Sequence, residues 1–264
     1  MNRLFESGVI IKTMNKPKIA LITGASSGIG AGIAKTLAAH GYVAIVTYKD
    51  HKDWGEAVVD DIVKNKGKAV LRQVDVTDEE SVKNCFDFVE KEYGYLDVLV
   101  NNAAVDGIAP METCTFDRWK TITRTKIDGN FLCTKYALPL LKKQKKSDLI
   151  VIMSSMGERP DPDDIPYCVG TAGTIMFVKA MAKGLAKYGI RTNGVGPAET
   201  RTNNGYWKEA GLTTDEAWEG FAKANPLGRV STPEDVGETV LAIIENKTAF
   251  WNGNFIYVNG GGHI

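Results

Sequence analysis

The segment Thr23–Gly30 carries glycines at a spacing that binds the pyrophosphate of a dinucleotide. It follows the apolar run Lys18–Ile22 and precedes residues that are typical of a helix. Gly24 permits a tight exit from the strand, Gly28 lets a phosphate approach the backbone, and Gly30 lets the helix pack close to the sheet. Ordinary glycine-rich turns also contain such glycines. The order of strand, turn and helix nevertheless favours phosphate binding by the first N–H groups of the helix.

Apolar runs typical of strands alternate with segments typical of helices along almost the whole chain. The predicted strands are Lys18–Ile22, Val43–Thr47, Ala69–Val74, Val98–Val100, Leu149–Met153, Arg191–Val195 and Asn254–Val258. The predicted helices are Ala31–Ala39, Trp54–Lys64, Glu80–Lys91, Phe116–Lys143, Cys168–Lys187 and Pro233–Ile244. Strands separated by helices predict an α/β fold, with a single Rossmann-type, doubly wound parallel sheet flanked by helices on both faces.

We expect one domain over residues 18–264, because no repeat, low-complexity tract or linker divides the sequence. Residues 1–17 form an N-terminal appendage, whose first 13 residues lack the apolar stretch of a signal peptide. The longest irregular stretch, residues 199–225, predicts a lid or binding loop over a substrate. The alternative is a helical insertion that covers the edge of the sheet.

Composition and charge exclude several classes of function. The 264 residues include 32 basic and 32 acidic side chains, and this balance disfavours a nucleic-acid or membrane surface. No apolar run reaches the roughly 20 residues of a membrane span. The cysteines lack CxxC spacing, which is typical of free thiols in the cytoplasm; they are Cys85, Cys114, Cys133 and Cys168. The histidines fall in no metal-ligand or triad pattern, so we expect no metal site; they are His40, His51 and His263.

Short motifs occur along the chain in an order typical of one enzyme family. They are Thr23–Gly30 (TGxxxGxG), Asp75-Val76, Leu96–Ala104 (LDxLVNNAG), Ser154-Ser155, Tyr167 at the head of a helix, Pro197–Thr202 (PGxxxT), Pro226–Arg229 with Pro233–Asp235, and Val258–Gly261. From Lys18 to Gly262 the sequence therefore resembles the classical short-chain dehydrogenases/reductases. The set of motifs is far more specific than any one of them.

The resemblance implies a reaction in which a tyrosine hydroxyl exchanges a proton with the substrate oxygen while a nicotinamide exchanges hydride. In the family, a lysine four residues later holds the ribose and lowers the tyrosine pKa. A serine hydrogen-bonds the substrate oxygen, and an asparagine on the preceding helix anchors a water molecule. The resemblance assigns the tyrosine to Tyr167 and the serine to Ser155, with Ser154 as the alternative because its spacing from Tyr167 is that of the family.

Two catalytic positions depart from the family pattern. Thr171 stands where the lysine is expected, and Lys126 stands where the asparagine is expected. A free tyrosine has a pKa near 10, so without a cation Tyr167 donates a proton better than it accepts one, which favours reduction. We hypothesise that Lys126 reaches toward the position that Thr171 leaves without a cation. The alternative is that Lys126 points to solvent and serves only the solubility of its helix.

The residue after the second strand decides the cofactor preference. Lys49 and Thr47 stand where NAD-specific relatives carry an acid, and Asp50 comes too late in the chain. A lysine suits a 2′-phosphate, so NADP(H) is favoured over NAD(H). The resemblance implies cofactor contacts from Gly24, Ser26, Ser27, Gly28, Ile29, Gly30, Tyr48, Lys49, Asp75, Val76, Asn102, Ala103, Pro197, Thr200 and Thr202.

The loop between the serine and the tyrosine borders the predicted substrate pocket. Its acidic residues are Asp161, Asp163 and Asp164, which we interpret as turn and cap residues. In the alternative, one carboxylate pairs with a cationic substrate such as an iminium, although Arg159 would neutralise part of that charge.

The sequence leaves three functions open. The preferred one is an NADPH-dependent reductase of a small C=O or C=N substrate, and the others are a non-redox lyase, isomerase or cyclase and an NADP(H)-binding regulatory protein. The apolar helices Phe116–Lys143 and Cys168–Lys187 also resemble those that pair across family interfaces, which predicts a homo-oligomer, a tetramer or a dimer.

Overall fold

The chain folds around a seven-stranded parallel sheet in the order β3-β2-β1-β4-β5-β6-β7. The computed structural model describes residues 16–105, 109–154, 160–202, 206–209 and 211–262. The strands are β1 Lys18–Ile22, β2 Tyr42–Tyr48, β3 Lys68–Gln73, β4 Val98–Asn101, β5 Ser147–Ile152, β6 Ile190–Pro197 and β7 Phe255–Val258. This arrangement confirms the predicted doubly wound α/β fold.

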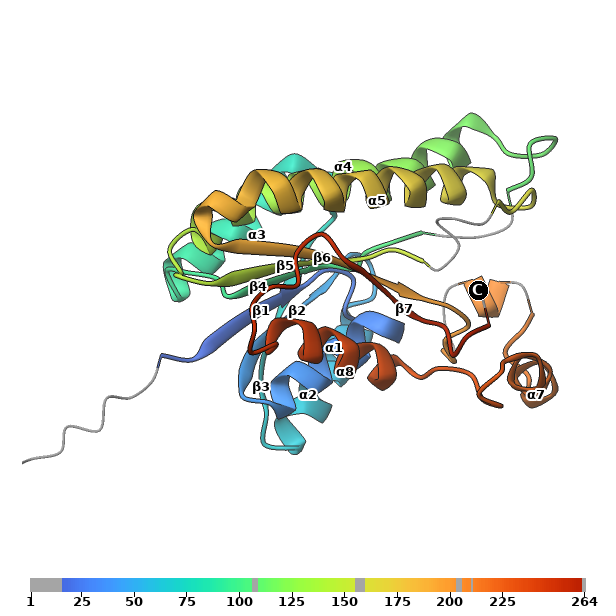
Figure 1. The fold of residues 1–264 in the computed structure, drawn as a ribbon, viewed down its shortest axis with the longest axis horizontal. Helices are drawn as coiled ribbons and strands as arrows, with labels where there is room; N and C mark the ends of the chain where they lie inside the picture. The colour runs from blue at the N-terminus through green and yellow to red at the C-terminus, as the bar shows by residue number, and fades with distance from the viewer. Residues whose placement is uncertain (1–15, 106–108, 155–159, 203–205, 210, 263–264) are drawn as a thin grey trace, which may run out of the picture.

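Helices cover both faces of the sheet, with α3, α4 and α5 on one face and α1, α2 and α8 on the other (Figure 1). Their bounds are α1 Gly28–Ala39, α2 Lys52–Lys64, α3 Glu79–Glu92, α4 Phe116–Leu141, α5 Ile165–Leu185, α6 Tyr206–Glu209, α7 Asp215–Ala224 and α8 Pro233–Ile244. A buried apolar cluster fills each interface between sheet and helices. Because helices bury both faces of the sheet, its strands consist mostly of apolar residues.

Two helices at the site begin earlier than the sequence predicted. Helix α1 begins at Gly28 rather than Ala31, because Ser27 is extended and the turn ends there. Helix α5 begins at Ile165 rather than Cys168, with Asp164 at the N-cap and Pro166 in the first turn. Proline is favoured there because its missing N–H has no helical partner in the first turn. Tyr167 therefore lies within the first turn of α5.

The segment 199–225 is not the irregular stretch that the sequence predicted, because it contains α6 and α7. The side chain of Thr214 caps α7, and Trp218 is buried. The Trp207 and Trp218 rings lie with centroids 5.0 Å apart, and Phe221 packs against both. Figure 1 shows α7 at the same end of the molecule as the first turns of α4 and α5. Its role as a lid stays a prediction.

Helix α5 and the turn after it, Ile165–Tyr188, have the length and hydropathy of a membrane span. Among the described residues it is the one segment that passes this test, which the buried helices of globular proteins also pass. In this fold α5 lies beside α4 over the sheet (Figure 1), and Thr174, Ile175, Val178 and Leu185 are buried on its inner face. The helix therefore belongs to the core.

Candidate active site

The loop after β1 is held in shape by the residues that end β4. Asn102 donates its side-chain N–H to the carbonyl oxygens of Thr23, at 2.8 Å, and Gly24, at 3.1 Å. The Thr23 hydroxyl in turn accepts hydrogen bonds from the backbone N–H groups of Asn102, at 2.9 Å, and Ala103, at 3.0 Å. The loop is thus fixed by polar contacts before any ligand arrives, which lowers the entropy cost of binding.

Thr47 is a second anchor of this loop that the sequence interpretation missed. Its hydroxyl accepts from the Gly24 N–H at 3.0 Å and donates to the Ile22 carbonyl at 3.1 Å. Its own carbonyl accepts from the Ala25 N–H at 2.8 Å. In the sequence, this residue is only a threonine at the end of a predicted strand, and that position does not indicate which groups its hydroxyl binds.

The glycines of the loop leave room that side chains would fill. A Cβ at Gly24, where φ is +62°, would lie 3.0 Å from the Ala103 Cα, and one at Gly30 would lie 2.5 Å from the Gly24 oxygen. Thr202 faces the loop, with its methyl 3.6 Å from the Cβ position of Gly28. Ser27 does not cap α1 with its side chain, and the first turn of α1 contains no acid. The residues present therefore fit a phosphate at this helix start.

A cavity of about 580 Å³ extends from the glycine loop along the ends of β3 and β4 to α4. Predicted cofactor residues that line it are Gly24, Ser26, Ser27, Lys49, Asp75, Val76, Asn102 and Ala103. The other predicted cofactor residues, absent from this lining, are Gly28, Ile29, Gly30, Tyr48, Pro197, Thr200 and Thr202. The Thr200 hydroxyl contacts the Ala198 carbonyl and the Ser231 hydroxyl, so it holds its own loop.

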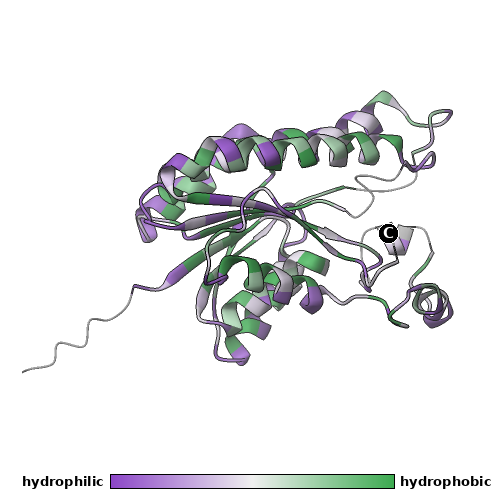
Figure 2. Ribbon diagram, viewed as in Figure 1, coloured by the Kyte–Doolittle hydropathy of each residue, from purple (hydrophilic) through white to green (hydrophobic). Residues whose placement is uncertain are grey.

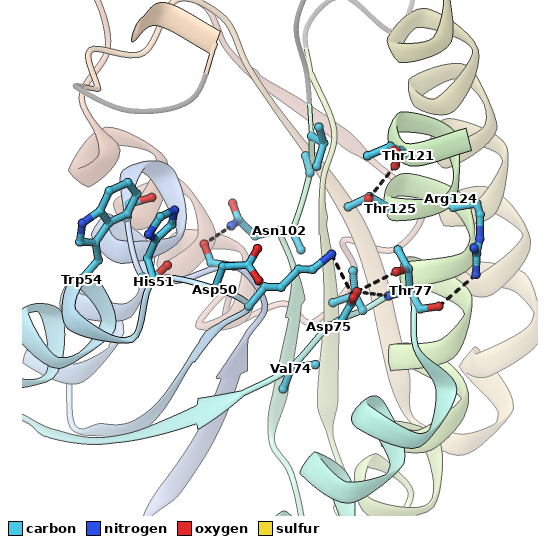
Figure 3. A pocket seen from close by; sticks show the side chains of 18 of the residues that line it. Asp50, His51, Trp54, Val74, Asp75, Thr77, Asn102, Thr121, Arg124 and Thr125 are labelled. Atoms are coloured by element: carbon cyan, nitrogen blue, oxygen red, sulfur yellow. Dashed lines mark hydrogen bonds and ion pairs between the residues drawn. The ribbon is translucent and has the colours of Figure 1, made fainter. Parts of the chain in front are cut away.

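Charges of both signs line the end of the cavity where the ribose is expected. Lys49 Nζ lies 3.0 Å from the Asp75 carboxylate, beside Thr77 (Figure 3). Partial burial of Asp75 opposes its ionisation, but hydrogen bonds from Thr77 and the nearby Lys49 lower its pKa. Asp50 also lines the cavity, and the interpretation that it comes too late in the chain to replace the ribose-binding acid stays a prediction. Lys49, Asp50 and Asp75 thus share this end of the cavity.

Tyr167 is placed by the segment that precedes α5. Asp164 pairs with Ala109 in an isolated parallel β-bridge, and the Ala109 N–H donates to the Asp163 carbonyl at 2.7 Å. Asp161 accepts from the Asp163 N–H at 2.9 Å, as in a turn, which supports the interpretation of these acids as turn and cap residues. The loop after β4 therefore fixes the start of α5 and with it the tyrosine.

Lys126 lies inside the protein beside the tyrosine. Only 3% of this residue is exposed, so the alternative that it points to solvent is wrong. Its Nζ lies 4.1 Å from the centroid of the Tyr167 ring. Thr171 is fully buried, and its hydroxyl has no hydrogen-bond partner among the described residues. A lysine amine thus stands beside Tyr167, although the helix position four residues later carries no lysine.

A row of buried polar contacts fixes the rotation of α4 between the sheet and α5. Asn101 at the end of β4 donates to the Thr134 hydroxyl at 3.1 Å, and Asn130 donates to the Thr174 hydroxyl of α5 at 3.3 Å. Because Asn130 follows Lys126 by one helical turn, this bond also fixes the direction in which Lys126 leaves α4. Sequence reasoning missed these residues, which resemble ordinary helix positions.

The preferred serine, Ser155, lies outside the described residues. Its alternative, Ser154, is described and is buried just after β5.

Comparison with known proteins identifies the family. The sequence pattern of the family described as enoyl-(acyl carrier protein) reductase matches residues 24–263. The chain belongs to the short-chain dehydrogenase/reductase family. It is 33% identical over 248 residues to the 3-oxoacyl-[acyl-carrier-protein] reductase FabG of Staphylococcus aureus, covering 94% of this chain and 99% of that one. An uncharacterized oxidoreductase of Bacillus subtilis, YxbG, is 35% identical over 250 residues, covering 92% and 90%.

Solved structures of short-chain dehydrogenases/reductases have the same fold. One from Mycobacterium marinum has a TM-score of 0.84 and 29% identity, covering 93% of this chain and 95% of that one. A short-chain dehydrogenase from Burkholderia cenocepacia, in complex with NADP, has a TM-score of 0.84 and 26% identity over 94% and 98%. Membership and these relatives make the protein an NAD(P)-dependent short-chain reductase.

Proposed function

We propose that the protein is an NADPH-dependent reductase of a small carbonyl compound, with Tyr167 as proton donor and Lys126 as the cation beside it. The observation that supports this most directly is the distance of 4.1 Å between Lys126 Nζ and the Tyr167 ring. The reductase relative and the NADP-bound neighbour support the choice of reaction and cofactor. In this site, the cation that the family carries on α5 comes from α4.

Each proposed residue acts either on the substrate oxygen or on the tyrosine that protonates it. When bound, the nicotinamide supplies hydride to the carbonyl carbon. Tyr167 donates its proton to the carbonyl oxygen, which Ser155 or Ser154 holds by a hydrogen bond. The Lys126 ammonium stabilises the tyrosinate that remains, because an opposite charge within a few ångströms favours the ionised form. The ring face also attracts the ammonium and offsets part of its burial.

The buried position of Lys126 also favours a neutral substrate. An iminium would bring a second positive charge next to the ammonium, and like charges in a poorly solvated site repel strongly. We therefore propose a ketone or aldehyde rather than an iminium.

NADPH oxidation in the presence of a panel of small ketones and aldehydes is expected to exceed NADH oxidation by about tenfold or more. The reason is that Lys49 offers a charged hydrogen bond to the 2′-phosphate, a contact of about 1.5–3 kcal/mol in other proteins. Replacing Lys49 with alanine should raise the Kd for NADPH about tenfold and leave that for NADH nearly unchanged. Fluorescence titration with both cofactors measures the affinities, and absorbance measures turnover.

Lys120→Ala is the matched control, because Lys120 lines the same cavity and also pairs with an acid, Asp117, at 2.7 Å. It should leave the cofactor preference unchanged. A preference for NADH that survives Lys49→Ala would contradict the proposed cofactor. No oxidation of either cofactor with any member of the panel would contradict the proposed reaction and favour a binding or non-redox role.

We also propose that the outer face of α4 and α5 joins copies of this chain. Large apolar side chains are exposed on it: Ile127 and Phe131 on α4, and Val169 and Met176 on α5. Figure 2 shows apolar residues along both helices, including positions turned away from the sheet. A second copy would bury the same patch by two-fold symmetry.

Light scattering at micromolar concentration should report a dimer or a tetramer. Met176→Glu places a charge in the proposed interface, where burial without a partner is unfavourable, and should shift the population toward smaller species. Val63→Glu is the control, because Val63 is similarly exposed but lies on α2, on the opposite face. A wild-type monomer would rule out this interface.

A further inference from the structure

Gly170 lies where the Lys126 side chain crosses from α4 to the tyrosine. It follows Tyr167 by three residues on α5, so both point to the same side of that helix. A Cβ at Gly170 would lie 3.1 Å from Lys126 Cδ, 3.3 Å from its Cβ and 3.7 Å from its Cγ. The stem of Lys126 therefore runs over Gly170, and its ammonium ends at the Tyr167 ring.

Other glycines of α5 differ from Gly170 in what they face. A Cβ at Gly173 would meet Ile127 Cδ1, the far end of a side chain whose residue is 39% exposed and which can move. A Cβ at Gly184 would meet no heavy atom within 4 Å among the described residues. At Gly170, in contrast, two carbons of a buried stem, Cβ and Cδ of Lys126, would lie closer than an ordinary contact. Carbon–carbon contacts are favourable near 3.5–4.0 Å, so the stem must shift to admit a methyl group.

We propose that Gly170 is a positioning residue: its lack of a side chain leaves the space through which Lys126 reaches Tyr167. This inference rests on the role proposed above for Lys126. A methyl group at position 170 would push the stem away from α5, and the ammonium would leave the ring. In this chain, Thr171 is thus accompanied by a lysine on α4 and by a glycine beneath that lysine.

The test is Gly170→Ala in the full chain, measured as kcat/KM for the carbonyl substrate over a range of pH. We expect a loss of about 2- to 150-fold, which corresponds to the usual coupling free energies of about 0.5–3 kcal/mol between contacting residues. The alkaline limb of the pH profile should move upward, as it does when the cation itself is removed. In a Lys126→Met background, Gly170→Ala should change kcat/KM by less than about twofold, because there is no ammonium to misplace.

Gly173→Ala and Gly184→Ala are the matched controls on the same helix, and neither should move the pH profile. If Gly170 served only the packing of the two helices, Gly170→Ala would lower kcat/KM equally in the wild-type and Lys126→Met backgrounds, because a methionine stem fills the same space. An equal loss in both backgrounds would therefore overturn the proposal. A pH profile of Gly170→Ala identical to wild type would do the same. If Gly170→Ala does not fold, Lys126→Ala/Gly170→Ala should fold because the stem is gone; failure of both would also reject the proposal.

The two proposals fail separately. A silent Lys126→Met would remove the proposed role of Lys126 and the role of Gly170 with it. A damaging Lys126→Met together with a silent Gly170→Ala would leave the role of Lys126 intact and reject only the role of Gly170.

Discussion

Replacing Tyr167 with phenylalanine is expected to lower carbonyl turnover by about 10²–10⁴-fold, the usual contribution of a positioned acid or base. The substitution removes only the hydroxyl, so the ring that Lys126 contacts at 4.1 Å stays in place. Nucleotide affinity should therefore change little. Steady-state kinetics with NADPH and the best carbonyl substrate, combined with a fluorescence titration of the cofactor, separates the two effects.

Tyr188→Phe is the matched control, because Tyr188 also lies under a lysine, with Lys142 Nζ 3.7 Å from its ring centroid. That pair is exposed at the far end of α5 and should contribute nothing to turnover. Unchanged turnover of Tyr167→Phe would exclude the tyrosine as the acid. A non-redox reaction or a charged substrate would then explain the site better, and Asp161 and Asp164 would be the next residues to change.

Replacing Lys126 with methionine should lower kcat/KM at neutral pH by about 10- to 10³-fold. The estimate follows from the shift of about one to three pKa units that an adjacent opposite charge produces in a buried group. Without the ammonium the pKa of Tyr167 rises, so the tyrosine becomes a weaker proton donor and the alkaline limb of the pH profile moves upward. Nucleotide binding should fall only modestly, and Lys142→Met should leave both properties unchanged.

Restoring the family residue with Thr171→Lys tests the same idea from the other helix. With Lys126 in place, a second ammonium in this buried space should leave kcat/KM unchanged or lower it, because each positive charge disfavours the protonated form of the other. In a Lys126→Met background, the same substitution should recover part of the lost activity. A large gain from Thr171→Lys alone, with Lys126→Met silent, would show that the site had simply lost its cation.

The order of strands, turns and helices along the sequence predicted where the nucleotide-binding part of the site would lie. The alternation of apolar strands and helices determines a parallel sheet, and in such sheets ligands bind where the strands end. Gly24 and Gly28 have positive φ angles, a requirement of the turn itself, so the spacing of the glycines in Thr23–Gly30 could be interpreted directly. Asn102 and Ala103 were predicted because Leu96–Ala104 resembles a motif of the family.

Only the tertiary structure decided which way the charged residues of the site point. The sequence placed Lys126 on a helix, but a helix exposes one side and buries another, and the rotation of α4 is set by hydrogen bonds to Asn101 and Thr174 on other elements. Lys126 and Tyr167 lie 41 residues apart in the sequence, and no local pattern relates them. The sequence by itself determined the fold and the family, and it has a threonine at position 171. The packing of α4 against α5 placed another lysine at the tyrosine, where the Lys126 stem passes close to Gly170, a residue without a side chain.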